Sequence, residues 1–68
     1  MEISARNQLR GRVTAITMGA VMAEVRVQVG QNEIVSAITR TSVEGLGIKV
    51  GDEVVAVVKA TEVMIGKP

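Results

Sequence analysis

The sequence predicts an all-β domain, and two observations carry that prediction. Apolar and polar residues alternate with a period of two over long stretches, most clearly from Val21 to Val29, and this period is typical of strands with one buried face. Glycine and other turn-forming residues interrupt the alternation about every ten residues, as in small β-barrels and sandwiches. The chain has 68 residues, which is enough for a single domain spanning residues 1–68 and too few for two.

The first two strands are expected on either side of a glycine turn. The stretch that begins at Gln8 alternates, and we assign its inward face to Leu9, Val13 and Ala15. Gly19 is the natural position for a turn, because glycine adopts positive φ values without steric cost. The following strand, over residues 21–29, turns its alanine and valine side chains inward and its polar side chains outward.

A third strand is predicted over residues 33–40, with Ile34 and Ile38 on one face and Val35 and Ala37 on the other. Residues 30–32 form the hairpin connection before it. The segment 41–47 begins with hydroxyl residues suited to a helix N-cap and carries glycines where a short helix would end. We therefore expect one helical turn after the third strand.

The fourth strand is predicted over residues 53–59 and is apolar on both faces. A strand of this kind is covered on two sides, and we assign one cover to the core and the other to a subunit interface. A short turn at residues 60–62 leads to a brief closing strand over 63–65. Together these elements predict an OB-like five-stranded antiparallel barrel, with one short helical turn between strands 3 and 4.

Composition predicts that the domain assembles with copies of itself. A chain this short buries only about 60% of its unfolded surface, and small domains usually add disulfides, a metal or oligomerisation. The sequence has no Cys and no His, yet 47% of it is hydrophobic with no Phe, Tyr or Trp. We therefore expect a homo-oligomer in which surplus aliphatic residues are buried between subunits.

Several functions are disfavoured by the residues that are missing. Without His or Cys there is no Ser-His-Asp triad, no thiol nucleophile and no usual zinc site. Ser42 and Lys59 could in principle form a hydrolase dyad, but a lysine at this position is better explained as the exposed end of a strand. We expect no enzyme activity, no cofactor and no site for a bare metal cation. Single-strand nucleic-acid binders use aromatic platforms and a basic groove, but the net charge is +1. Nucleic-acid binding therefore remains only an alternative.

No apolar stretch is long enough to span a membrane, and no secretory signal pattern is visible at the N-terminus. We therefore expect a cytoplasmic protein that has no membrane partner.

The side chains available to the domain suit an oxyanion site better than a catalytic one. The oxygens of a tetrahedral dianion only accept hydrogen bonds, so its site should consist of N–H groups, hydroxyls and an ammonium. The segment 4–11 is rich in such donors, and further donors lie at predicted strand ends and turns. The candidate donors are Ser4, Arg6, Thr39, Ser42, Lys59 and Thr61. Hydroxyl residues at these positions are also common turn formers, and spacing alone does not separate the two interpretations.

The order of three motifs resembles that of the molbindins, which are small Mop-type molybdate-binding proteins made of a single TOBE-like domain. The motifs are S-A-R-N-Q-L-R-G at residues 4–11, T-R-T-S-V-E-G-L-G at 39–47 and V-V-K-A-T-E-V-M-I at 57–65. The resemblance covers essentially the whole chain. It implies a homo-hexamer, arranged as a trimer of dimers, that binds molybdate or tungstate between subunits and performs no chemistry.

Carried over residue by residue, the resemblance implies two kinds of site. At the dimer interface, one subunit would offer the Ser4 hydroxyl and the backbone amides of Ala5 and Arg6. The other subunit would offer donors from Thr39, Ser42, Lys59, Ala60 and Thr61. Many relatives have Ser where this chain has Ala60, so here only the backbone amide of that residue remains. A second site near the threefold axis would use the backbone amides of Gly19, Ala20 and Val21.

The function implied by the resemblance is intracellular storage and homeostasis of molybdate. The alternative that we carry forward is a regulatory or nucleic-acid-binding OB-fold module that requires a partner chain.

Overall fold

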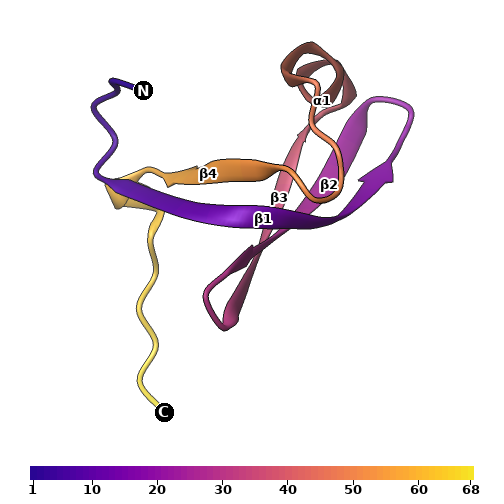
Figure 1. Cartoon of the computed structure of the whole chain (residues 1–68). Helices are drawn as coiled ribbons and strands as arrows, with labels where there is room; N and C mark the ends of the chain where they lie inside the picture. Colours follow the sequence, from indigo (N-terminus) through magenta and orange to yellow (C-terminus); the bar gives the residue numbers. More distant parts are fainter.

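The computed structural model describes all residues from Met1 to Pro68 and contains one antiparallel sheet with a helix at one end (Figure 1). The sheet has four strands in the order β3-β2-β1-β4. The prediction of an all-β domain with one helical segment between the third and fourth strands is confirmed. The elements are β1 (Asn7–Met18), β2 (Met22–Val29), β3 (Asn32–Thr39), α1 (Arg40–Leu46), β4 (Glu53–Val58) and the 3₁₀ helix η1 (Ala60–Glu62).

The long strand β1 connects the two halves of the sheet. Its first half pairs with β4, from Asn7 opposite Val58 to Arg12 opposite Glu53, and its second half pairs with β2. Gly11 lies where the two halves meet. A Cβ atom on Gly11 would lie 2.5 Å from the carbonyl oxygen of Gln28, so the backbones approach here at a distance that excludes any side chain.

A β-bulge in β1 corrects the inward face that the sequence predicted. Val13 lies opposite Val27, but the register then shifts, so that Ala15 lies opposite Arg26 and Ile16 opposite Val25. The extra residue reverses the alternation. Ile16 therefore packs against the core in place of Ala15, and the assignment of Ala15 to the same face as Val13 was wrong.

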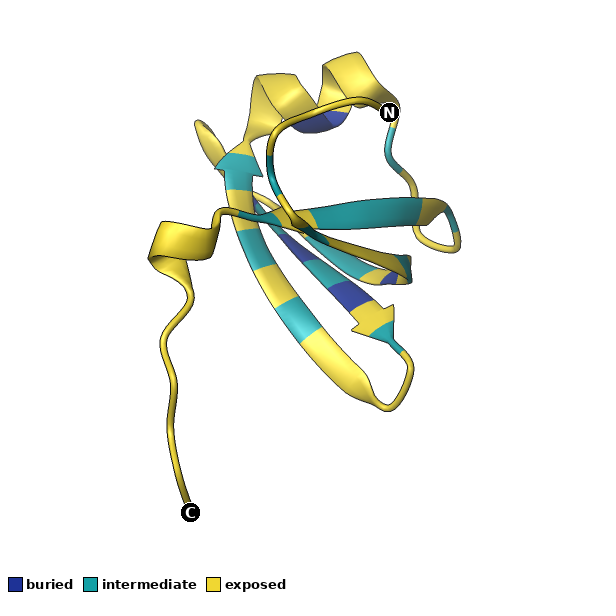
Figure 2. Ribbon diagram, turned by 90° about the vertical axis from the view of Figure 1, so that its left-hand side faces the viewer, coloured by how far each residue is buried: buried dark blue, intermediate teal, exposed yellow.

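The core is small and is formed mainly by β1 and β2 with one side chain from the helix. Figure 2 shows its buried positions along the sheet and on the underside of α1. The alternation predicted for the second strand is confirmed at Ala23, Val25 and Val27, which are all buried. It was wrong at Val21, which precedes β2 in the turn and is 72% exposed. The buried residues are Val13, Ala23, Val25, Val27 and Val43.

Helix α1 is longer than predicted and begins earlier. It has seven residues, its N-cap is Thr39 and its C-cap is Gly47, which adopts a left-handed φ of 65°. The predicted single turn with its cap at Thr41 or Ser42 was wrong, because the Thr39 side chain accepts the hydrogen bond from the Ser42 N–H. Gly47 ends the helix as expected, whereas Gly45 lies inside it.

The sheet does not close into a five-stranded barrel. The strand expected at residues 63–65 is absent, and Met64 and Ile65 are 92% and 90% exposed. The segment leads away from the domain (Figure 1), and its only backbone hydrogen bond is the one from the Val63 N–H to Ala60 at 3.4 Å. A strand needs a paired neighbour to form its hydrogen bonds, and this segment has none within its own chain.

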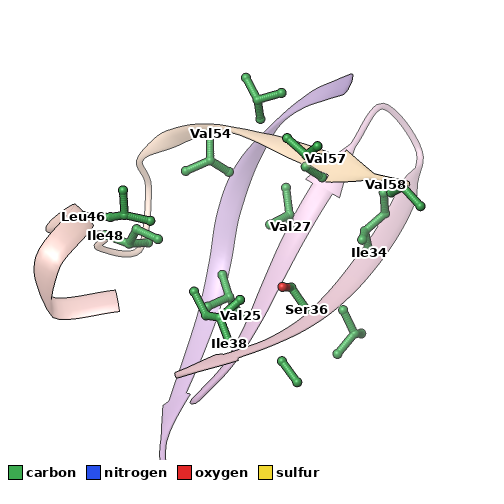
Figure 3. Close-up of a pocket in the computed structure, with 14 residues that line it drawn as sticks. Val25, Val27, Ile34, Ser36, Ile38, Leu46, Ile48, Val54, Val57 and Val58 are labelled. Atoms are coloured by element: carbon green, nitrogen blue, oxygen red, sulfur yellow. The ribbon is translucent and has the colours of Figure 1, made fainter. Parts of the chain in front are cut away.

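The open side of the sheet is an apolar groove between the edge strands β3 and β4. Its volume is about 520 Å³, and 13 of its 14 lining residues are hydrophobic. In Figure 3, Ile34 and Ile38 lie on one side of the groove and Val54, Val57 and Val58 on the other.

No helix in the structure is long and apolar enough to cross a membrane.

Candidate anion-binding site

The first and third sequence motifs meet at one end of the β1–β4 ladder. Because Asn7 lies opposite Val58, the residues just before β1 and just after β4 are neighbours, although more than fifty positions separate them in the sequence. In Figure 1 the chain enters β1 and leaves β4 at the same side of the sheet. The register therefore brings together the segments 4–6 and 59–61.

The segment before β1 offers main-chain donors that have no partner in the chain. The N–H groups of Ser4, Ala5 and Arg6 make no intramolecular backbone hydrogen bond. The Gln8 side chain donates from Nε2 to the Ala5 carbonyl at 2.8 Å. Since the carbonyl and N–H of one trans peptide point in opposite directions, this contact fixes the Arg6 N–H on the side away from Gln8.

Two cations without ion pairs lie at the same end of the ladder. Arg6 and Lys59 form no salt bridge and are exposed, whereas the arginines at 10, 26 and 40 are each held by a glutamate. Arg26 is bound on both sides: its hydrogen bond to Glu33 and the charge of Glu24 raise its pKa. Glu44 contacts Arg40 and is therefore not a partner of Arg6. Arg6 and Lys59 thus remain available to an anion.

Thr39 and Ser42 form a hydroxyl pair at the start of α1. The Thr39 Oγ1 accepts from the Ser42 N–H at 3.0 Å and lies 2.7 Å from the Ser42 Oγ. One proton of the pair is used between the two oxygens, so the other hydroxyl is free to donate outward. Both side chains are exposed.

The hydroxyl pair does not lie with the other candidate donors. Thr39 is opposite Met22 in the β2–β3 ladder, next to the hairpin that follows the far end of β1. In Figure 1, α1 is at one end of the molecule and the Lys59 segment is at the other. A single chain therefore does not bring Thr39 and Ser42 together with Lys59.

The turn between β1 and β2 holds the residues predicted for the second site. The Ala20 and Val21 N–H groups have no backbone partner, while the Gly19 N–H donates to Met22 at 2.8 Å. The carbonyls of Gly19 and Val21 are both engaged by Arg40, at 3.3 Å and 2.8 Å. The turn thus contains two N–H groups without a backbone partner and two carbonyls held by Arg40.

Two residues that take part in this arrangement were not assigned a role from the sequence. Gln8 and Arg40 lie inside the first and second motifs, but neither was predicted to bind a neighbouring carbonyl. Only the motif positions themselves signal them, because no spacing rule specifies a contact such as that of Arg40 with Gly19, 21 positions away. The structure contains no cluster of three or more His, Cys, Asp or Glu residues able to hold a metal ion.

Comparison with known proteins gives full-length matches. The TOBE domain family model matches residues 3–65. Molybdenum-pterin-binding protein 2 of Clostridium pasteurianum is 54% identical over 66 residues, which cover 96% of this chain and 97% of that protein.

Two solved structures have nearly the same fold. A molybdate-binding protein from Sporomusa ovata superposes with a TM-score of 0.94 at 45% identity, covering 98% of this chain and 100% of that one. The cytoplasmic molybdate-binding protein ModG, solved with molybdate bound, gives a TM-score of 0.93 at 43% identity. That match covers 100% of this chain and 49% of ModG.

Proposed function

Because this chain belongs to the TOBE domain family and, within it, to the molbindins, we propose that it binds molybdate, and tungstate equally, between subunits of a homo-oligomer. The observation that carries the proposal is the end of the β1–β4 ladder. There, the unpartnered N–H groups of residues 4–6 lie beside two unpaired cations, Arg6 and Lys59. Charge-assisted hydrogen bonds of this kind contribute roughly 1.5–3 kcal/mol each.

The donor set explains which oxyanions should bind. Molybdate is a dianion whose oxygens only accept hydrogen bonds, so a site made of N–H, hydroxyl and ammonium groups satisfies all of them. Phosphate carries a proton at neutral pH that would have no acceptor, and an unsatisfied buried polar group costs about 1–3 kcal/mol. Sulfate lacks that proton and is rejected by its smaller size. Tungstate has nearly the shape of molybdate, so this site does not discriminate against it.

We assign the donors to two protomers, because within one chain they lie at opposite ends of β1. One protomer contributes the Ser4 hydroxyl, the amides of Ala5 and Arg6, and the segment 59–61. A neighbouring protomer contributes the outward hydroxyl of the Thr39–Ser42 pair. The assignment is supported by the separation of the two groups within one chain, and it differs from the carried-over scheme, which puts Lys59 on the same protomer as Thr39. The turn at Gly19–Val21 forms a second, weaker site from its free amides.

Assembly also supplies the strand that a single chain lacks. The exposed apolar residues 63–65 of one protomer close the groove between β3 and β4 of another, giving the five-stranded barrel between chains. The proposal is supported by the matching chemistry of the two surfaces, since both are apolar and both include backbone without a strand partner. Three such dimers form the proposed hexamer.

The biological role that follows is storage and buffering of the anion in the cytoplasm, without catalysis and without binding to nucleic acid. The location is supported by the relative ModG, which is described as cytoplasmic. The absence of activity is supported by the relatives, which are named as binding proteins.

Isothermal titration of the protein with molybdate, tungstate, sulfate and phosphate tests this function. We expect molybdate and tungstate to bind with affinities within a few-fold of each other. Phosphate should bind at least roughly tenfold more weakly, because one unsatisfied polar group of about 1.4 kcal/mol is a factor of ten. Sulfate should also bind more weakly than molybdate, because it is smaller. Native mass spectrometry on the same samples should give a hexamer. Absence of heat with every oxyanion, together with retardation of DNA at low salt, would instead support the nucleic-acid-binding alternative.

A further inference from the structure

Arg40 holds the turn between β1 and β2 with both its main chain and its side chain. Its backbone N–H donates to the Val21 carbonyl at 2.8 Å, and its guanidinium Nη1 donates to the Gly19 carbonyl at 3.3 Å. Its Nε lies 3.6 Å from the Glu44 carboxylate, one helical turn further along α1. Arg40 therefore connects the start of the helix to the turn.

The contact with Gly19 determines where the next amide points. The chain has no cis peptide bonds, so the Gly19 carbonyl and the Ala20 N–H are antiparallel ends of one planar unit. With the carbonyl turned toward Arg40, the Ala20 N–H is directed away from it. That N–H has no partner in the chain, and the peptide that carries it is fixed by the guanidinium.

The same contact makes the amide a stronger donor. A hydrogen bond from a charged donor is shorter and stronger than a neutral one, and hydrogen bonds in a chain polarise one another. A guanidinium on the Gly19 carbonyl therefore increases the positive character of the Ala20 N–H. Glycine at 19 restrains this peptide less than other residues would, because glycine has the largest range of backbone conformations.

We propose that Arg40 is a positioning residue that orients and polarises the Gly19–Ala20 peptide as a donor to an oxyanion at the turn. The inference rests on the proposed binding of molybdate. It adds a residue that acts on the turn site by binding the Gly19 carbonyl, on the side opposite the Ala20 N–H. Arg40 itself does not touch the anion. At the interface site, Gln8 instead binds the Ala5 carbonyl and so orients the Arg6 N–H. This contact does not depend on Arg40.

Replacing Arg40 with methionine tests the inference, because methionine keeps an unbranched side chain of similar reach and removes the donor. The readout is the backbone amide signals of Ala20 and Arg6 in ¹H–¹⁵N spectra recorded during titration with molybdate. In the wild type both signals should shift. In Arg40→Met, the Ala20 response should need roughly tenfold more molybdate, which is the loss expected when the charge-assisted hydrogen bond from the Ala20 N–H to the anion is no longer formed. The Arg6 response should be unchanged.

Three further variants control for structural effects. Arg40→Lys keeps the charge and a donor, and should recover most of the Ala20 response. Glu44→Gln breaks the contact of Arg40 with the helix but not that with Gly19, and should behave as the wild type. Arg12→Ala removes an exposed arginine that has no ion pair, and should also have no effect.

The outcomes separate the inference from the proposed function. An Ala20 response in Arg40→Met equal to that of the wild type, or equal losses at Ala20 and Arg6, would overturn the role of Arg40. A wild-type protein in which Arg6 responds and Ala20 does not would overturn it as well. If neither amide responds in the wild type, the proposed function itself fails, and the role of Arg40 fails with it.

Discussion

Replacing Lys59 with alanine is expected to weaken molybdate binding by about 10- to 100-fold while the fold is retained. In the proposed site Lys59 supplies the ammonium, and one charge-assisted hydrogen bond contributes about 1.5–3 kcal/mol, where 1.4 kcal/mol is a factor of ten. The side chain is exposed and makes no ion pair, so its loss should leave the thermal midpoint nearly unchanged. Isothermal titration and a thermal melt measure the two effects.

Lys49→Ala is the matched control for this variant. Lys49 is also exposed and also forms no ion pair, but it lies in the loop after α1. We expect it to bind molybdate as the wild type does, and Ser4→Ala to lose affinity together with Lys59→Ala. Equal affinities for Lys59→Ala, Lys49→Ala and the wild type would count against the interface site.

Replacing both Met64 and Ile65 with aspartate is expected to break the assembly into smaller species. The two side chains are 92% and 90% exposed in the single chain, and the proposed hexamer buries them in the groove of a neighbour. Burial of an unpaired carboxylate is strongly unfavourable, so the charged segment should stay in water. Sedimentation velocity or native mass spectrometry would show the lower mass.

The charge of the C-terminal tail needs its own control. Lys67→Asp changes charge two positions beyond the apolar segment and should leave the mass of the assembly unchanged. A double aspartate variant with the same mass as the wild type would show that residues 63–65 do not hold the subunits together.

The strands could be predicted from the sequence wherever one face is buried without interruption. In β2 the period-two pattern of Ala23, Val25 and Val27 corresponds to buried positions, and in β3 Ile34 and Ile38 are half-buried while Val35 is exposed. These side chains report local burial directly, because successive residues of a strand point to opposite faces. Strand bounds were accurate to within one or two residues for the same reason.

Features that depend on distant parts of the chain could not be predicted. The bulge after Val13 depends on how β1 bends between two partners, and nothing in residues 13–15 signals it. The N-cap was placed two or three residues late, because Thr39, Thr41 and Ser42 are all suitable caps. The prediction of a fifth strand was wrong because residues 63–65 have strand-like composition but no partner within one chain.

The residues of the candidate site could be predicted from the sequence, but their spatial arrangement could not. The donor-rich motifs were visible in the sequence, since Ser4, Arg6 and Lys59 stand out in a chain without His, Cys or aromatic residues. Their grouping was not visible, because it follows from the pairing of Asn7 with Val58. The roles of Gln8 and Arg40 were missed because each acts on a carbonyl, and side-chain contacts of that kind follow only from three-dimensional positions.

Crystals grown with molybdate and measured at the molybdenum absorption edge test the central claim most directly. The account predicts an anomalous peak at the seam between two chains, within hydrogen-bonding distance of Ser4 and Lys59 of one protomer and of the Thr39–Ser42 pair of its neighbour. Seams without a peak, or peaks enclosed by the donors of one chain alone, would contradict it.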